Sequence, residues 1–208
     1  SMVSNGVPAE KVLVNGYGVS LEEFRPGRST DGIFRVIQCG TISVRKGVHH
    51  LLRAFQEAAL PKSELWFVGA GLDKTPLRPI IESYADANVR FIGRVPQRDL
   101  QKYYAECSVF VSASIADGFG MTVPQAMACG LPVIVTENVG ASESVNDGVN
   151  GFVIPIRDVE ALKEKLTFLY RHPSIRLAMG RAALKTVRAG YTWDAYGDRL
   201  AQIFADRC

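Results

Sequence analysis

From Ile33 onward, short runs of β-branched and aromatic residues alternate with longer stretches of helical periodicity. No other feature of the sequence limits the possible folds as strongly. The alternation is typical of βαβ units that wind a parallel sheet with helices on both faces. The sequence therefore predicts an α/β fold. The predicted strands are Phe34–Cys39, Leu65–Val68, Val89–Ile92, Val109–Ser112, Val133–Val135 and Phe152–Ile154. The predicted helices between them are Val48–Ala59, Leu77–Ala85, Asp99–Cys107, Pro124–Cys129 and Val159–Tyr170.

The two ends of the chain do not follow this alternation. Near the start, the apolar run Val12–Val14 precedes the turn formers Asn15-Gly16 and Pro26-Gly27, which indicates a linker with one edge strand. Two helical patterns, Ser174–Arg188 and Asp194–Ala205, close the chain, and we expect them to pack across a sheet edge or onto another domain. The expected division is a hinge or linker over 1–30, the α/β domain over 31–190 and a terminal helix over 191–208. The opening residues read as an addition ahead of mid-protein sequence, so an excised domain is expected.

Composition sets limits on location and partners. The 208 residues are 47% hydrophobic, and a net charge of +3 gives no reason to expect a nucleic-acid partner. No window reaches the ~20 apolar residues of a membrane span, and no signal-peptide pattern opens the chain, so the cytoplasm is the expected location. No CxxC spacing occurs among Cys39, Cys107, Cys129 and Cys208. The first three lie in apolar or small-residue runs and are expected to be buried free thiols.

Two loops after predicted strands carry unusual chemistry, at the sheet edge where ligands bind in such folds. Gly40 opens a loop that brings Arg45 and Lys46 to the start of a helix. Cations there oppose the helix dipole at a cost of about 0.3 to 1 kcal/mol each, so we expect a bound anion, with two solvated charges as the alternative. After the third strand, Arg94 and Val95 follow a glycine, where backbone can approach a flat base closely.

The strongest signal is the loop Asp117-Gly118-Phe119-Gly120, which lies between a strand and a short helix. The backbone amides of Gly118, Phe119 and Gly120 predict a site for an anion or for sugar hydroxyls, with Asp117 as an acceptor beside them. Gln125 is expected either to contact the ligand or only to complete a capping box with Thr122. A second polar loop, 138–143, brings Glu143 to the same edge.

Three other features favour plainer interpretations. His49 and His50 have no carboxylate or cysteine at ligand spacing, so no metal site is expected. Gly69-Ala70-Gly71 is followed by Lys74 where a dinucleotide fingerprint needs its third glycine, which predicts a tight turn and argues against hydride transfer. Trp193 is expected to be a packing anchor.

Taken in order, these motifs resemble the glycogen-synthase-like group of retaining nucleotide-sugar glycosyltransferases, the "glycosyl transferases group 1" family. Its members have the GT-B architecture of two facing Rossmann-like domains, and the resemblance covers essentially the whole chain as the carboxy-terminal half. The fold expected on this basis is a Rossmann-like sheet with helices on both faces plus two C-terminal helices. The landmarks are Asn15-Gly16, Lys46-Gly47, Val68–Gly71, Phe91–Gly93, Asp117–Gly120, Ala126–Val133 and Gly148-x-x-Gly151-Phe152.

The resemblance also implies roles for individual residues. The family carries two glutamates eight positions apart, and Asp117 and Gln125 stand at those positions, toward the donor sugar and the ribose respectively. The diphosphate would lie on Arg45, Lys46 and the amides near Phe119 and Gly120, with Arg45 replacing an arginine that the family has after Gly40. The base would lie near Arg94 and Val95, and the sugar between Asp117 and the loop that carries Glu143. Asp117, Lys46 and Arg45 are thus the expected catalytic residues.

The implied function is donor binding by one half of a retaining glycosyltransferase. The expected partners are a nucleoside-diphosphate sugar and an amino-terminal domain that holds the acceptor, onto which the helix after Trp193 would pack. No metal or other cofactor is expected, the domain alone should be inactive, and any membrane-surface contact would belong to the other half. Two alternatives stay open: an inactive nucleotide-sugar-binding module, because Asp117 and Gln125 depart from the family pattern, and a nucleotide-sugar epimerase on the same architecture.

Overall fold

The computed structural model describes residues 2–27, 31–84 and 86–206, and predictions for Ala85, Cys208 and residues 28–30 lie outside this part. Six strands form one parallel sheet in the order β3-β2-β1-β4-β5-β6. They are β1 (Phe34–Cys39), β2 (Ser63–Val68), β3 (Val89–Gly93), β4 (Val109–Ser112), β5 (Val133–Thr136) and β6 (Gly151–Ile154). The predicted α/β fold is confirmed, and the chain adopts the strand order of a Rossmann-like sheet.

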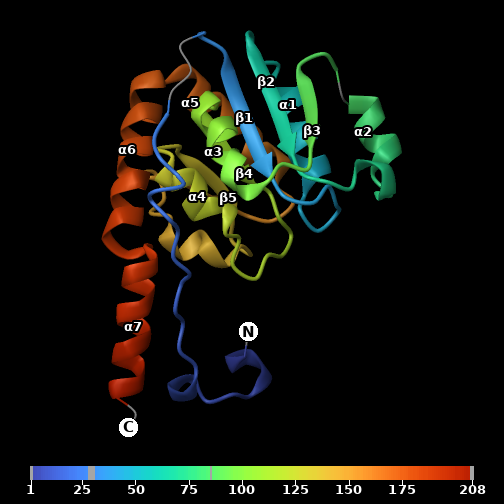
Figure 1. Cartoon of the computed structure of the whole chain (residues 1–208). Helices are drawn as coiled ribbons and strands as arrows, with labels where there is room; N and C mark the ends of the chain where they lie inside the picture. The colour runs from blue at the N-terminus through green and yellow to red at the C-terminus, as the bar shows by residue number, and fades with distance from the viewer. Residues whose placement is uncertain (1, 28–30, 85, 207–208) are drawn as a thin grey trace.

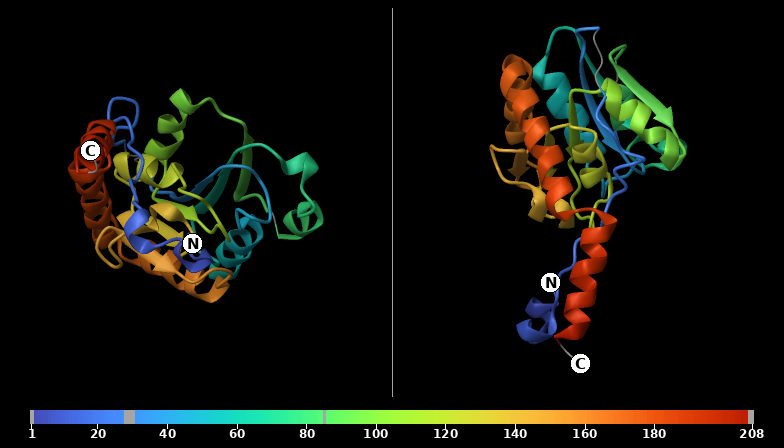
Figure 2. Two further views of the ribbon diagram at one scale, coloured as in Figure 1. Left: turned by 90° about the horizontal axis from the view of Figure 1, so that it is seen from below. Right: turned by 60° about the vertical axis from the view of Figure 1, so that its left-hand side comes forward.

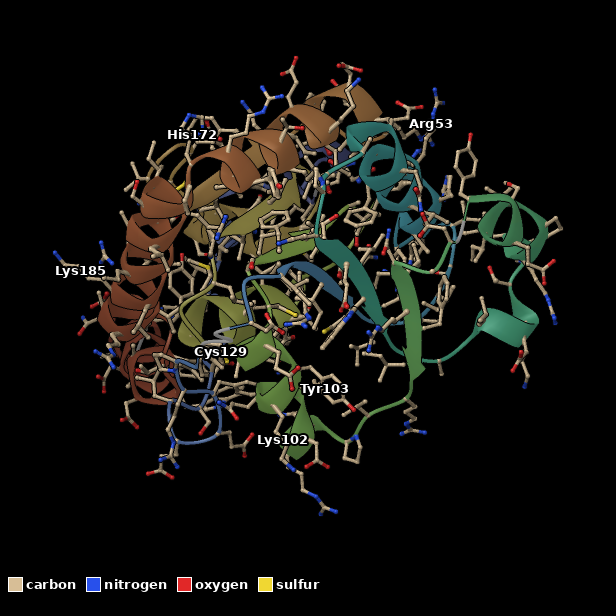
Figure 3. All side chains as sticks on the ribbon, turned by 90° about the horizontal axis from the view of Figure 1, so that it is seen from above. Arg53, Lys102, Tyr103, Cys129, His172 and Lys185 are labelled. Carbon is tan, nitrogen blue, oxygen red and sulfur yellow. The ribbon has the colours of Figure 1, made fainter. Side chains whose placement is uncertain are left out.

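Helices cover both faces of this sheet (Figure 1). One face is covered by α1 (Val48–Ala58), α2 (Arg78–Tyr84) and α5 (Val159–Arg171), and the other by α3 (Gln97–Glu106) and α4 (Thr122–Ala128). Short 3-10 turns lie at Val3–Asn5, Ala9–Lys11, Leu72–Lys74 and Gly140–Ser144. On the outer side of α1, Arg53 points away from the body, as Lys185 does from α6 (Figure 3). No helix in the described part has the length and apolarity needed to cross a bilayer.

The central strands are buried along their whole length. Because both of their faces are covered, their sequences are nearly continuous apolar runs. All six residues of β1 are buried, including the polar Arg35 and Gln38. Arg35 is compensated by Glu64 on the neighbouring strand at 3.0 Å and stacks over the ring of Trp66. On α1, Leu51, Leu52 and Phe55 form the predicted apolar stripe against the sheet.

Two further helices, α6 (Pro173–Gly190) and α7 (Trp193–Ala205), follow the sheet. α6 packs on α4, and the contact is close at Gly180, where a Cβ would lie 2.1 Å from the carbonyl oxygen of Gly130. α7 buries none of its residues. It projects from the body beside the amino-terminal segment, as Figure 1 and the right view of Figure 2 show.

The predicted edge strand at Val12–Val14 is wrong, because this segment runs beside α7 rather than along the sheet. Asn15 donates to the carbonyl oxygen of Tyr196 at 3.3 Å, and Arg199 donates to the side chain of Asn15 and to the carbonyl oxygen of Gly16. These contacts hold the hinge on the helix. After these contacts, Val19 forms a single parallel β-bridge with Thr192.

Candidate functional site

The strand order changes direction between β1 and β4, and in open parallel sheets the crevice at this switch point is where ligands bind. The loops after β1 and β4 meet there. Ile115 donates its amide to the carbonyl oxygen of Arg45 at 2.8 Å. Gly47 lies so close to the chain that a Cβ would fall 1.8 Å from the carbonyl oxygen of Ala113. The two loops therefore form one rigid unit around the position where Lys46 precedes α1.

The predicted cations and the predicted acid come together at this point. The Lys46 ammonium forms an ion pair with Oδ2 of Asp117, and Nη1 of Arg45 lies 3.9 Å from Oδ1 of the same carboxylate. Arg45 also donates to the carbonyl oxygen of Ala116 at 2.9 Å. The side chains of Lys46 and Asp117 are only 15% and 14% exposed, whereas that of Arg45 is 58% exposed. The contact is thus a half-enclosed pair with an open cation at its rim.

Gln38 fixes the backbone of Lys46, a role that sequence reasoning missed. Its Nε2 donates to the carbonyl oxygen of Lys46 at 2.7 Å, while its buried Oε1 has no partner in the described part of the chain. The stem of Lys46 passes Gly40, where a Cβ would lie 3.5 Å from Cε. A polar residue in an otherwise apolar central strand was the available signal, because a buried amide needs hydrogen-bond partners.

The loop Asp117–Gly120 is interlocked with the loop after β5. Asp117 donates its amide to the carbonyl oxygen of Asn138 at 3.0 Å and accepts from the amide of Gly140 at 3.1 Å. Among the described residues, no acceptor is found for the backbone amides of Gly118, Phe119 and Gly120. The three amides that follow Asp117 in the chain are therefore available to an anion.

One pocket of about 410 Å³ is lined by Gly40, Arg94 and Val95, three of the residues predicted to bind the donor. Gly69 closes its side: its φ is 157°, and a Cβ there would lie 1.8 Å from the carbonyl oxygen of Gly40. The predicted turn at 69–71 thus brings β2 against the loop after β1. The full lining is Cys39, Gly40, Thr41, Val68, Gly69, Ala70, Arg94, Val95, Leu100 and Thr122.

Glu143 lines a different pocket, of about 320 Å³, together with Phe119, Gly140, Tyr191 and Arg199. Burial, followed by the nearby Glu143 carboxylate, raises the pKa of the Tyr191 hydroxyl above its ordinary value. Neither Tyr191 nor Arg199 was predicted from the sequence. They reach this edge only because the hinge and the last two helices fold back beside it.

Gln125 lines neither of these two pockets. Its side chain is buried, and its Oε1 has no partner within the described residues. The capping box is wrong, because α4 already begins at Thr122, with Met121 as the N-cap and no side-chain cap. The motif needs Thr122 just outside the helix, so the true start puts Gln125 one position too far along.

His49 and His50 lie in the first turn of α1. Their ring centroids lie 3.9 Å apart and the ring planes are tilted by 40°. Burial lowers the pKa of both rings, that of His50 to about 4 with help from His49, Arg157 and Arg53. Within the described residues, no three His, Cys, Asp or Glu side chains gather as metal ligands do.

Three of the cysteines lie in the core of the described part of the chain. Cys39, Cys107 and Cys129 are the predicted buried free thiols, and burial raises the pKa of Cys39 to about 12. Trp193, expected to be a packing anchor, is 50% exposed and packs edge-on against Tyr196.

Comparisons with known proteins agree on one group. The family described as "Glycosyl transferases group 1" matches residues 20–186. The chain is 34% identical over 178 residues to a GDP-mannose-dependent monoacylated alpha-(1-6)-phosphatidylinositol monomannoside mannosyltransferase of Corynebacterium glutamicum, covering 81% of this chain and 46% of that protein. The chain spans about half the length, or less, of the curated relatives that it matches.

Solved structures share the fold at low identity. HepE of Anabaena, in complex with UDP and glucose, superimposes with a TM-score of 0.84 at 22% identity, over 98% of this chain and 59% of that one. The C-terminal domain of a glycosyl transferase group 1 protein of Francisella tularensis gives a TM-score of 0.72 at 19% identity, over 84% of this chain and 99% of that one. The fold is therefore that of the carboxy-terminal GT-B domain, and with the family match it follows that this chain belongs to the glycosyl transferases group 1 family.

Proposed function

We propose that this chain is the donor-binding domain of a retaining glycosyltransferase, which moves a sugar from a nucleoside-diphosphate sugar to an acceptor held by an amino-terminal domain. The observation that carries this proposal is that Arg45 and Lys46 contact Asp117 at the switch point of the sheet, where the next three backbone amides have no acceptor among the residues that the structure describes. Fixed cations and amide dipoles suit the charge that collects on the β-phosphate when a nucleoside diphosphate departs. Such a site compensates that charge with protein groups alone, so we propose transfer without a metal or other cofactor.

The two pockets supply the ends of the donor. The base would enter the pocket lined by Gly40, Arg94 and Val95, where the lining is mostly backbone and apolar side chains. The transferred sugar would lie toward Asp117 and the loop that carries Glu143, next to the second pocket. The UDP and glucose bound to HepE support a nucleotide sugar as the ligand class. Contact between the ribose and Gln125 is part of this proposal and requires the buried amide to become accessible.

An amino-terminal domain is supported by the surface of the hinge and α7. Large apolar side chains are exposed there, namely Leu13 (51%), Val14 (69%), Trp193 (50%) and Phe204 (63%). The hinge and α7 project from the body (Figure 2), and several exposed apolar side chains on such a segment indicate an interaction surface. We propose that this arm packs on the acceptor domain, that this chain alone transfers no sugar, and that any membrane-surface contact lies on that other half. The cytoplasm remains the location expected for it.

Calorimetric titration of the chain with UDP, GDP, ADP and their sugar conjugates, in the presence of a chelator, tests the proposal. One nucleotide should bind without metal. Lys46→Ala should weaken it by about tenfold or more, since a charge-assisted hydrogen bond contributes about 1.5 to 3 kcal/mol. Lys185→Ala removes the same charge from the outer side of α6 and should change nothing. Gln125→Ala tests the ribose contact.

Four results would contradict parts of this proposal. Failure of every nucleotide to bind would overturn donor binding, and binding only with a divalent ion would overturn metal independence. Binding by a full-length protein that shows no turnover with any acceptor would favour an inactive module. Interconversion of the donor sugar without transfer would instead favour an epimerase.

A further inference from the structure

The Lys46–Asp117 pair joins a fixed group to an adaptable one. Asp117 is held through its own backbone by Asn138 and Gly140, and a Cβ on Gly120 would lie only 3.4 Å from its Oδ2. Lys46 is tied at its backbone by Gln38, but its head group stands at the end of four methylenes. The ammonium, on the longer and more flexible stem, is therefore the group that can adapt its position to the carboxylate.

We propose that Asp117 is an internal counter-ion of Lys46, which orients the ammonium before the donor binds and competes with the donor's diphosphate for it. This inference rests on the proposed function and changes the role of one residue within it. The family resemblance implies that Asp117 contacts the transferred sugar. The geometry points instead to a positioning residue that acts on the diphosphate through Lys46.

The charges at the site support this assignment. Arg45 and Lys46 bring two positive charges, and Asp117 within ion-pair distance cancels one of them. The diphosphate of a nucleotide sugar carries about two negative charges, so the site with its carboxylate matches only half of them. An ammonium has three donors, and at least one of those of Lys46 is committed to the carboxylate. Asp117 thus sets the site's affinity for diphosphate below what its two cations would give.

The isosteric variant Asp117→Asn separates the two roles. It keeps an oxygen acceptor for Lys46 but removes the competing charge. A counter-ion role predicts that UDP and UDP-glucose, or GDP and GDP-mannose, bind more tightly by a similar factor, on the order of tenfold for one unscreened charge a few ångströms away in a partly wet site. A sugar contact predicts unchanged affinity for the nucleoside diphosphate and weaker binding of the sugar conjugate.

Calorimetry with both nucleotide pairs should be done on the wild type, Asp117→Asn, Lys46→Ala and the double variant, each first shown to be folded by thermal unfolding. The gain from Asp117→Asn should shrink strongly when Lys46 is absent. Glu57→Gln is the matched control, because it removes one negative charge from an exposed pair with Arg53 on α1 and should leave every affinity unchanged.

Three results would overturn the counter-ion role of Asp117. Weaker binding of the sugar conjugate alone in Asp117→Asn overturns the inference and leaves the proposed function intact. An equal gain with and without Lys46 shows direct repulsion of the ligand and also overturns it. If the wild type binds neither nucleotide pair, the proposed function fails and this inference fails with it.

Discussion

Replacing Gly47 by alanine should both destabilise the chain and weaken nucleotide binding. Gly47 has φ 63° and ψ 23°, a left-handed conformation that costs alanine about 1 to 2 kcal/mol. The new Cβ would also lie 1.8 Å from the carbonyl oxygen of Ala113, far inside an ordinary contact of 3.4 Å or more. Forcing these loops apart adds about 1 to 3 kcal/mol, so the free energy of unfolding should fall by about 2 to 5 kcal/mol. Because Lys46 adjoins the shifted residue, nucleotide affinity should fall by about tenfold or more.

Gly148→Ala is the matched control for this substitution. Gly148 has a similar φ of 73°, but nothing lies within 4 Å of its Cβ position. It should therefore show only the conformational cost, about 1 to 2 kcal/mol, and full nucleotide affinity. Urea unfolding and calorimetry on both variants make the comparison. Equal destabilisation of the two, or an intact nucleotide site in Gly47→Ala, would refute the reasoning that loop contact at Gly47 shapes the site.

Three further predictions concern helix packing, pH and the buried thiols. A Cβ at Gly197 in α7 would meet open space, so Gly197→Ala should raise the free energy of unfolding by about 0.5 to 1 kcal/mol. A Cβ at Gly180 in α6 would lie 2.1 Å from the carbonyl oxygen of Gly130, so Gly180→Ala should lower it. Chemical denaturation in which both variants shifted the free energy of unfolding in the same direction would contradict this. Burial and neighbouring cations lower the pKa of His50 to about 4, so the unfolded chain, with the ordinary value near 6.5, binds a proton that the folded chain does not. Stability should thus fall as the pH drops from 6.5 toward 4, and His50→Gln should flatten that fall in urea titrations; parallel curves would show that His50 is not responsible. Burial raises the pKa of Cys39 to about 12, so at pH 8 iodoacetamide should modify this thiol only after the chain is unfolded. Modified Cys39 found by peptide mass spectrometry of the native chain would contradict this.

The sheet was predictable from the sequence because its strands are covered on both faces and their apolar runs leave little choice. β1 and β4 match the predicted bounds, and the other four strands begin or end within two residues of them. The ends of helices that depend on a single capping or proline residue were predicted less accurately. Pro124 suggested the start of α4, since proline suits a first helical turn, but the turn that contains it opens two residues earlier.

Errors arose where apolar character did not mean burial in the sheet. Val12–Val14 has the composition of a strand, yet Val14 is 69% exposed and the segment lies beside α7. Its apolar side chains are consistent with a surface for another domain, which a pattern along one chain cannot distinguish from an edge strand. Trp193, predicted to be a packing anchor, is half exposed and contacts Tyr196 on its own helix.

The topology of the sheet explains where the residues of the site lie, but not which groups they contact. Strand order alone places Lys46 and Asp117 at one edge, although 71 positions separate them, because the carboxyl ends of parallel strands meet there. Whether the two groups face a common ligand or face each other depends on side-chain reach. Aspartate is one methylene shorter than the glutamate of the family pattern, and here it ends at the ammonium of Lys46. The contact that the structure shows is the one between Asp117 and Lys46. If Asp117 acts through that cation, as proposed above, the effect of Asp117 variants will be seen in nucleotide affinity, and affinity rather than catalysis is the first property to measure in them.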